Sequence, residues 1–208
     1  MFLYNNNIME TKVRKTLALE KEEDEDEEYD IKIYRENNHI YFYAEIDRNT
    51  ISKLNILLRE AEEYCIILAL KLRIDLVPIY LHIYSNGGYI YSSFAAIDVI
   101  NCSKIPVYSI IEGATASAGT LISLVCKKRY IRPNAYMLIH QLSSEIWGKM
   151  DSIIDEYKNL TQLMKKITDI YTEYSVLTPK KLNKLLKHDL WLDAKKSIKY
   201  GLVDELYV

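Results

Sequence analysis

The spacing between apolar residues changes several times along the chain, and each change marks a new secondary-structure element. His39–Ile46 and Ile79–Tyr84 are rich in aromatic and β-branched residues, which is typical of strands. Between them, apolar residues recur at the spacing of one helix face: Ile51, Leu54, Leu57, Leu58 and Ala61. The pattern predicts a helix that begins at a cap on Asn49 or Thr50 and runs to about Tyr64.

The alternation continues to the end of the chain. Further strands are predicted at Val107–Ile111, Tyr130–Arg132, Tyr136–Ile139 and Leu202–Val208. Further helices are predicted at Tyr91–Asn101, Ser117–Cys126 and Trp147–Tyr174, after a cap at Thr178-Pro179, and from a cap at Asp193 to Gly201. Because strands and helices alternate, we expect an α/β fold with a mainly parallel sheet and helices outside it.

Charge is distributed unevenly along the chain. Residues 1–30 contain ten acidic and four basic residues, and Glu20–Glu28 is almost entirely carboxylate. Such a block repels itself and cannot build an apolar core, so residues 1–30 are predicted to form a disordered acidic tail. The other nineteen acidic and twenty-three basic residues give residues 31–208 a mild charge of +4, and we expect this part to form a single domain.

Composition excludes several classes of protein. With 49% hydrophobic and 27% charged residues, the 208-residue chain is too apolar to be wholly disordered and too charged for a membrane protein. The sequence contains no block of Lys or Arg residues, so nothing in it indicates a nucleic-acid partner. Its three cysteines form no metal-binding pattern and no secretory signal is evident, which predicts a cytoplasmic protein with reduced thiols and no bound metal.

Glycine is concentrated in one part of the chain. Four of the six glycines lie within residues 87–119. Gly87 and Gly88 follow the predicted strand Ile79–Tyr84 and precede a helix, which is where open α/β sheets bind ligands. Residues without side chains can offer their backbone N–H groups there. An isolated Gly-Gly is more often a plain tight turn, and the phosphate-loop pattern is absent.

A serine and a histidine also stand at predicted strand ends. Ser117 lies where a strand gives way to a helix among small residues, which is the setting of an exposed nucleophile, with a plain helix cap as the equal alternative. His140 is the first polar residue after an apolar strand. A Ser–His pair needs a carboxylate that orients the imidazole. The candidates for this carboxylate are Asp189, Asp193 and Asp204.

Four blocks of residues, in this order, resemble the ClpP family, the proteolytic subunits of the ATP-dependent Clp protease. They are Ser85-Asn86-Gly87-Gly88, Gly113 to Gly119 around Ser117, Met137-Leu138-Ile139-His140-Gln141, and Asp189 to Asp204 with Ala194 and Gly201 between them. The similarity covers about residues 36–207. It implies the ClpP/crotonase-like fold, with repeated β-β-α units, a mainly parallel sheet and a protruding helical handle at about residues 147–175.

The resemblance also assigns roles to single residues. It implies that Ser117 is the nucleophile, His140 the general base and Asp189 the orienting acid. The N–H groups of Gly88 and Ala118 would form the oxyanion hole. Peptide binding is implied at Gly88, Tyr89, Ile90 and Ser143.

By the same resemblance, the protein is a serine endopeptidase that cleaves unfolded polypeptides to short peptides inside a ring-shaped chamber, through an acyl-enzyme. The family pattern implies a homo-oligomer of two stacked heptameric rings, a tetradecamer in which the helical handles interdigitate. An AAA+ unfoldase of the ClpX, ClpA or ClpC type would feed the chamber. No cofactor is expected, since ATP is used only by the separate unfoldase, and no nucleic-acid or membrane partner is expected.

Departures from the family pattern keep a second hypothesis open. Asn86 replaces a proline, Leu142 replaces another, and residues 143–147 replace a glycine-rich segment. His188 stands where an arginine is common before the catalytic aspartate. The alternative is therefore a non-catalytic structural subunit of a mixed Clp ring. A crotonase-like acyl-CoA enzyme does not use the Ser-His-Asp set, and a membrane-bound signal-peptide peptidase needs an anchor that is missing here.

Overall fold

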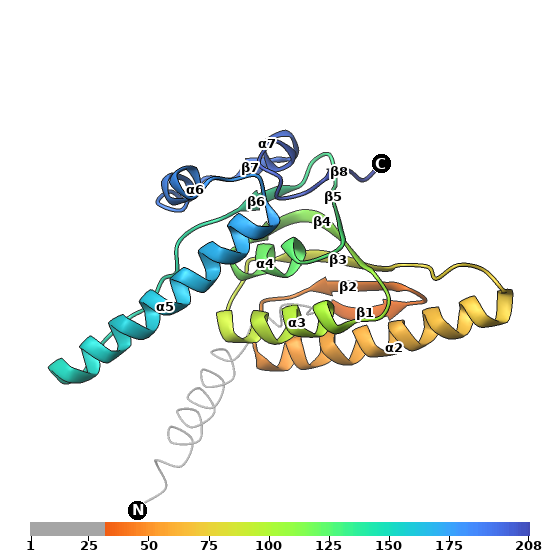
Figure 1. Ribbon diagram of the computed structural model, residues 1–208, viewed down its shortest axis with the longest axis horizontal. Helices are drawn as coiled ribbons and strands as arrows, with labels where there is room; N and C mark the ends of the chain where they lie inside the picture. Colours follow the sequence, from red (N-terminus) through yellow and green to blue (C-terminus); the bar gives the residue numbers. More distant parts are fainter. Residues whose placement is uncertain (1–31) are drawn as a thin grey trace, which may run out of the picture. The chain divides into compact units, whose positions relative to one another are not determined.

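The computed structural model describes residues 32–208, and the predicted acidic tail of residues 1–30 lies outside the described residues (Figure 1). The strands are β1 Lys32–Glu36, β2 His39–Tyr43, β3 Ile79–Ser85, β4 Val107–Ala116, β5 Lys128–Ile131, β6 Tyr136–Leu138, β7 Leu192–Asp193 and β8 Glu205–Leu206. The helices are α2 Arg48–Leu72, α3 Ile90–Cys102, α4 Ala118–Leu124, α5 Met150–Tyr174, α6 Pro179–Leu185 and α7 Ala194–Lys199.

The strands of residues 32–208 form one sheet in the order β1-β2-β3-β4-β5-β8, with β6 beside β4 and β7 beside β6. Five pairs of neighbouring strands are parallel: β2–β3, β3–β4, β4–β5, β4–β6 and β5–β8. Only the pairs β1–β2 and β6–β7, within the described part, are antiparallel. The predicted α/β fold with a mainly parallel sheet is confirmed.

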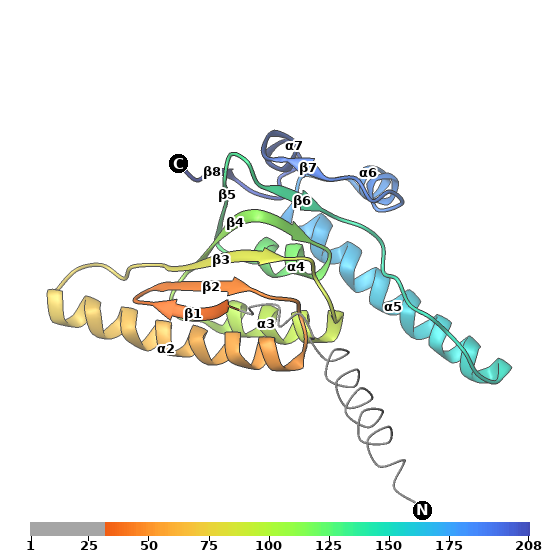
Figure 2. The same cartoon turned by 180° about the vertical axis from the view of Figure 1, so that it is seen from behind.

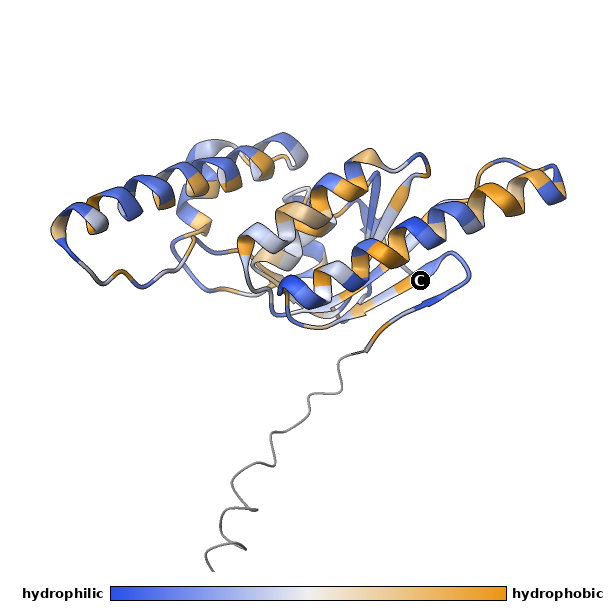
Figure 3. Ribbon diagram, turned by 90° about the horizontal axis from the view of Figure 1, so that it is seen from below, coloured by the Kyte–Doolittle hydropathy of each residue, from blue (hydrophilic) through white to orange (hydrophobic). Residues whose placement is uncertain are grey.

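Helices α2, α3 and α4 cover one face of β1–β4 (Figures 1 and 2). Alternate residues such as Ile40 and Phe42 of β2 point to these helices and are buried. The helices bury their apolar faces and leave hydrophilic faces outside (Figure 3). The other face of the same strands carries aromatic side chains, including Tyr80 and Tyr108, whose ring centroids lie 5.8 Å apart.

Helix α2 is longer than predicted. It ends at Leu72 instead of Tyr64, because Cys65 and Ala69 continue the buried stripe beyond the predicted end. Its cap is Asp47, not Asn49 or Thr50. The Asp47 carboxylate accepts a hydrogen bond from the Thr50 N–H at 2.7 Å, and the Thr50 hydroxyl accepts one from the Asp47 N–H at 2.9 Å.

Strand β4 is also longer than predicted, and its extension places Ser117. Its first half pairs with β5, whereas Ala114–Ala116 pairs with β6. The small residues after Ile111 look like a loop in the sequence, but they continue the strand because β6 provides a new neighbour. The chain leaves β4 directly into Ser117, next to the end of β6.

The remaining boundaries differ by a few residues. Helix α5 begins at Met150, three residues after the predicted start at Trp147. The predicted caps Thr178 and Asp193 are confirmed, since their side chains accept hydrogen bonds from the N–H groups of Lys181 and Lys196. Strands β1 and β7 were not predicted. Each is antiparallel to its neighbour, and β7 has only two residues, too few for a periodic pattern.

Candidate active site

The predicted site residues stand at the ends of three neighbouring parallel strands. Gly87 and Gly88 follow β3, Ser117 follows β4 and His140 follows β6. Because β3 and β6 pair with β4 in the same direction, their carboxyl ends meet at one edge of the sheet. The fold therefore brings together residues that are up to 53 positions apart in sequence.

The backbone of Ser117 has a rare conformation. Its φ is +53° and its ψ is −126°, which costs a residue with a side chain roughly 1–3 kcal/mol. The Ser117 N–H donates to the Leu138 carbonyl at 2.9 Å, and the Ser117 carbonyl accepts from the Thr120 N–H at 3.0 Å. Ser117 occupies the N-cap position of α4, but its side chain makes no capping hydrogen bond to the helix. A strained serine at a strand–helix junction is typical of a nucleophile.

Gly87 and Gly88 fit closely against their surroundings. A Cβ atom on Gly87 would lie 2.7 Å from the Ser117 Cβ and 3.1 Å from the Ala118 nitrogen. A Cβ atom on Gly88 would lie 2.2 Å from the Ile46 carbonyl oxygen. Both glycines have positive φ, +98° and +142°. Gly87 is therefore held against the start of α4 and Gly88 against Ile46, and a residue larger than glycine fits at neither position.

Two backbone N–H groups beside Ser117 have no partner in the part of the chain that the structure describes. Within residues 32–208, neither the Gly88 N–H nor the Ala118 N–H donates a hydrogen bond. The neighbouring groups are engaged, since the Ile46 N–H donates to the Gly87 carbonyl at 2.7 Å and the Tyr89 N–H donates to the Ile46 carbonyl at 2.8 Å. Unpaired N–H groups beside a nucleophile are the donors that an oxyanion requires.

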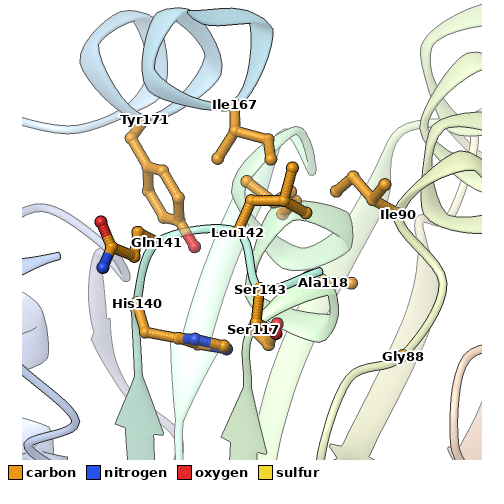
Figure 4. A pocket seen from close by; sticks show the side chains of 11 residues that line it. Gly88, Ile90, Ser117, Ala118, His140, Gln141, Leu142, Ser143, Ile167 and Tyr171 are labelled. Atoms are coloured by element: carbon orange, nitrogen blue, oxygen red, sulfur yellow. The ribbon is translucent and has the colours of Figure 1, made fainter. Parts of the chain in front are cut away.

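Ser117 and His140 line the same pocket, and the His140 ring lies next to the Ser117 side chain (Figure 4). Gly88, Ala118, Ile90 and Ser143 line this pocket too, so the structure brings most of the predicted site together. Tyr89 is the exception: it does not line the pocket, and its side chain is exposed. Ser117 and His140 make no hydrogen bond to each other.

Asp189 lies outside this pocket. It is exposed, and within the described residues it makes neither a hydrogen bond nor an ion pair with His140. The antiparallel register of β6 with β7 pairs Met137 with Leu192, and three further steps in that register would place His140 opposite Asp189. The ladder ends at the pair Met137–Leu192, before that point, and the Gln141 N–H donates to the Leu186 carbonyl at 2.9 Å. In this structure, Asp189 therefore does not orient the His140 ring through a hydrogen bond.

The other two candidate acids have structural roles. Asp193 caps α7 by accepting from the Lys196 N–H at 2.8 Å. Asp204 pairs with Arg129, accepting from the Arg129 backbone N–H at 2.8 Å and from its guanidinium. These bonds leave Asp189 as the candidate acid whose carboxylate is free of such a role.

The sequence did not identify the apolar wall of the pocket. Leu121 of α4 lines the pocket. Ile167 and Tyr171 line it from α5, and Leu142 from the segment after His140 (Figure 4). Ile167 belongs to the apolar stripe of α5, which reads in sequence as ordinary packing. Tyr171 is 1% exposed, and burial raises the pKa of its hydroxyl. No local motif distinguishes these residues, because the contacts join segments that are distant in sequence.

A second polar cluster lies on the aromatic face of the sheet. His39 Nδ1 lies 3.0 Å from His82 Nε2, and His82 Nδ1 lies 3.0 Å from a Glu112 carboxylate oxygen. Tyr43 and Arg132 also donate to Glu112. Burial lowers the pKa of both imidazoles. Among residues 32–208, no group of three or more His, Cys, Asp or Glu side chains is placed to hold a metal ion.

Comparison with known proteins identifies the family. The family model described as Clp protease matches residues 20–208. The chain belongs to the Clp protease family. A relative from Treponema denticola, ATP-dependent Clp protease proteolytic subunit 2, is 39% identical over 131 residues, which cover 62% of this chain and 66% of that protein. The ATP-dependent Clp protease proteolytic subunit of Streptococcus mutans is 36% identical over 132 residues, covering 62% and 67%.

The fold of this Clp protease family member matches a solved structure. A ClpP1 mutant from Listeria monocytogenes superposes with a TM-score of 0.71 at 24% sequence identity, covering 82% of this chain and 91% of that one. The predicted ClpP-like fold is therefore confirmed. No helix in the part of the chain that the structure describes is both long and apolar enough to span a membrane.

Proposed function

We propose that this Clp protease family member is a serine endopeptidase that cleaves unfolded polypeptides to short peptides. The observation that carries the proposal is the position of Ser117, strained at the β4–α4 junction, in one pocket with His140 and beside two unpaired N–H groups. The names of the relatives, proteolytic subunits of the ATP-dependent Clp protease, support the same activity.

The chemistry follows from these groups. The Ser117 hydroxyl attacks the substrate carbonyl carbon while the His140 imidazole takes the hydroxyl proton. His140 then gives this proton to the leaving amine, which leaves an acyl-enzyme on Ser117. Water, activated by His140, attacks the acyl carbon and releases the second peptide. Asp189 would orient the imidazole and stabilise its charged form, which requires the segment of residues 187–190 to move its carboxylate to the His140 ring.

The Gly88 and Ala118 N–H groups would bind the negatively charged oxygen of the tetrahedral intermediate. Removal of one such donor typically costs about 2.7–4 kcal/mol of transition-state stabilisation. Ile90, Leu121, Leu142 and Ile167 line the pocket next to Ser117, which suits an apolar side chain of the substrate. Ser143 and Gly88 flank the same pocket and would contact an extended peptide.

We also propose the assembly that the family resemblance implies, two stacked heptameric rings fed by an AAA+ unfoldase. The first half of α5 is mostly exposed and carries Met150, Ile154 and Tyr157, while only its second half is buried against the rest of residues 32–208. A helix that leaves apolar residues uncovered fits a contact between subunits.

The three cysteines are free, which agrees with a reducing, cytoplasmic location.

A reactive-serine probe tests the catalytic proposal. A fluorophosphonate should label Ser117 in the assembled protein, and the protein should hydrolyse a fluorogenic peptide, with Ser117→Ala as the matched control. Native mass spectrometry of the same samples reports the assembly. An assembled protein that neither labels nor hydrolyses contradicts the proposal.

The alternative function is a non-catalytic subunit of a mixed Clp ring. The exposed position of Asp189, with no bond to His140, favours it. Turnover that arises only when a second Clp subunit is added, and that survives Ser117→Ala in this chain, would support this alternative. Turnover lost on Ser117→Ala would exclude it.

A further inference from the structure

A chain of hydroxyl groups connects α5 to the backbone of Ser117. The Tyr171 hydroxyl oxygen lies 2.5 Å from the Thr120 Oγ1, and this oxygen lies 2.6 Å from the Ser117 carbonyl oxygen. A carbonyl oxygen can only accept, so the single Thr120 hydroxyl proton goes to Ser117. Thr120 must then accept from Tyr171. The direction of the chain is fixed: Tyr171 donates to Thr120, and Thr120 donates to Ser117.

These bonds are protected from water. Thr120 is 0% exposed and Tyr171 is 1% exposed. Burial raises the pKa of the Tyr171 hydroxyl, so it keeps its proton and its donor role at neutral pH. A buried hydroxyl group without a hydrogen-bond partner lowers the stability of the fold. Here the Tyr171 and Thr120 hydroxyl groups are hydrogen-bond partners of each other. The arrangement is therefore a single, fully oriented network.

The carbonyl of Ser117 and the N–H of Ala118 belong to the same peptide group. This group is planar, and in its trans form the C=O and N–H bonds point in opposite directions. A donor that fixes the carbonyl on one side of the plane therefore also fixes the direction of the N–H on the other side. The Ala118 N–H is one of the two unpaired donors at the pocket.

We propose that Thr120 and Tyr171 are positioning residues, which orient the Ser117–Ala118 peptide group and so direct the Ala118 N–H toward the oxyanion. This inference rests on the proposed peptidase function. Because Tyr171 lies on α5, the position of this helix also affects the oxyanion hole. Figure 4 shows Tyr171 extending from α5 toward the pocket, with its hydroxyl on the pocket side.

The test combines four single variants with the double variant Thr120→Val/Tyr171→Phe. Thr120→Val removes the donor to Ser117 while it keeps the size of the side chain, and Tyr171→Phe removes one oxygen atom. Thr120→Ser retains the hydroxyl and serves as the rescue variant. Tyr174→Phe is the matched control, since Tyr174 lies on the same helix and its hydroxyl makes no hydrogen bond within residues 32–208.

The oxyanion hole acts on the transition state, so kcat should fall while KM stays within about twofold. We expect kcat for a fluorogenic peptide to fall about tenfold or more in Thr120→Val, since a small misplacement of a catalytic group has effects of this size. In Tyr171→Phe we expect a fall of about three- to tenfold, the range of one hydrogen bond. The double variant should equal Thr120→Val, because Tyr171 acts through Thr120. Fluorophosphonate labelling of Ser117 should slow in the same order.

Thermal unfolding is measured on every variant. If Thr120→Val does not fold, Tyr171→Phe carries the test alone. The positioning inference is overturned if the wild type is active and Tyr171→Phe behaves like Tyr174→Phe. It is also overturned if Thr120→Ser loses as much kcat as Thr120→Val, or if only KM changes. A wild type that assembles but neither labels nor hydrolyses overturns the proposed function, and the inference with it.

Discussion

Replacement of Gly88 by alanine should both destabilise the fold and disable the site. The new Cβ atom would lie 2.2 Å from the Ile46 carbonyl oxygen, whereas an ordinary contact is 3.4–4 Å. Backbone atoms, not a flexible side chain, occupy this space. Gly88 and Ile46 must therefore move apart by about 1 Å, since no rotamer can relieve a clash with backbone.

The cost of this change has two parts. The clash strains the hydrogen bonds that flank Gly88, from Ile46 N–H to Gly87 and from Tyr89 N–H to Ile46, each contributing roughly 1 kcal/mol. The φ of +142° adds roughly 1–3 kcal/mol for a residue with a side chain. Together we expect a loss of about 3–5 kcal/mol from a total stability of about 5–15 kcal/mol. Movement of the Gly88 N–H by about 1 Å should lower kcat/KM by about 100-fold.

Gly148→Ala is the matched control for this experiment. Its φ is also positive, at +155°, but its Cβ atom would meet nothing closer than the Ser152 Cβ at 3.6 Å. Urea unfolding and peptide hydrolysis should be compared for both variants and the wild type. A folded Gly88→Ala protein with wild-type kcat/KM would refute the assignment of this N–H to the oxyanion hole. Equal losses in both variants would show that the clash with Ile46 has no effect.

Three further predictions follow from single contacts. Ser117→Ala should lower peptide hydrolysis by at least about 1,000-fold and abolish fluorophosphonate labelling; residual labelling would place the nucleophile elsewhere. Arg129→Met removes the ion pair with Asp204 and should lower the free energy of unfolding by about 2–4 kcal/mol in urea titrations, and a change within 0.5 kcal/mol would show that this ion pair does not stabilise the fold. Burial lowers the pKa of His82 and His39 below the ordinary 6.5, so the unfolded chain binds more protons there. The free energy of unfolding should therefore be highest above pH 6.5 and fall as the pH drops below it, and a flat profile between pH 7.5 and 5.5 would contradict this.

The strand-end residues could be predicted from the sequence because their signals are local. A glycine pair after an apolar strand, and a polar residue at the end of another, are visible without knowledge of the fold. The end of α2 was missed because Leu70 and Leu72 are exposed and blur the helical pattern. The end of β4 was missed because its pairing with β6 depends on a strand that lies 20 residues further along.

The position of the proposed acid, Asp189, is not determined by a local pattern in the sequence. The residue pattern alone offers several aspartates, and the ClpP resemblance assigns Asp189. In the structure, Asp193 and Asp204 are both engaged in bonds to other parts of the fold. Its carboxylate nevertheless makes no hydrogen bond to His140 in the single chain, where the β6–β7 register ends at Met137 and Leu192. A motif can therefore identify this acid without placing it.

The geometry of Ser117 depends on segments that are far apart in sequence. Its N–H is held by Leu138 at the end of β6, and its carbonyl by Thr120, which Tyr171 of α5 supports. Gly87 lies so close to the Ser117 Cβ atom that a side chain on residue 87 would not fit. Each contact alone is weak, but together they hold a backbone conformation that Ser117 would not adopt by itself. The local sequence around Ser117 therefore marks the proposed nucleophile, whereas its orientation is a property of the sheet and of the helix packed against it.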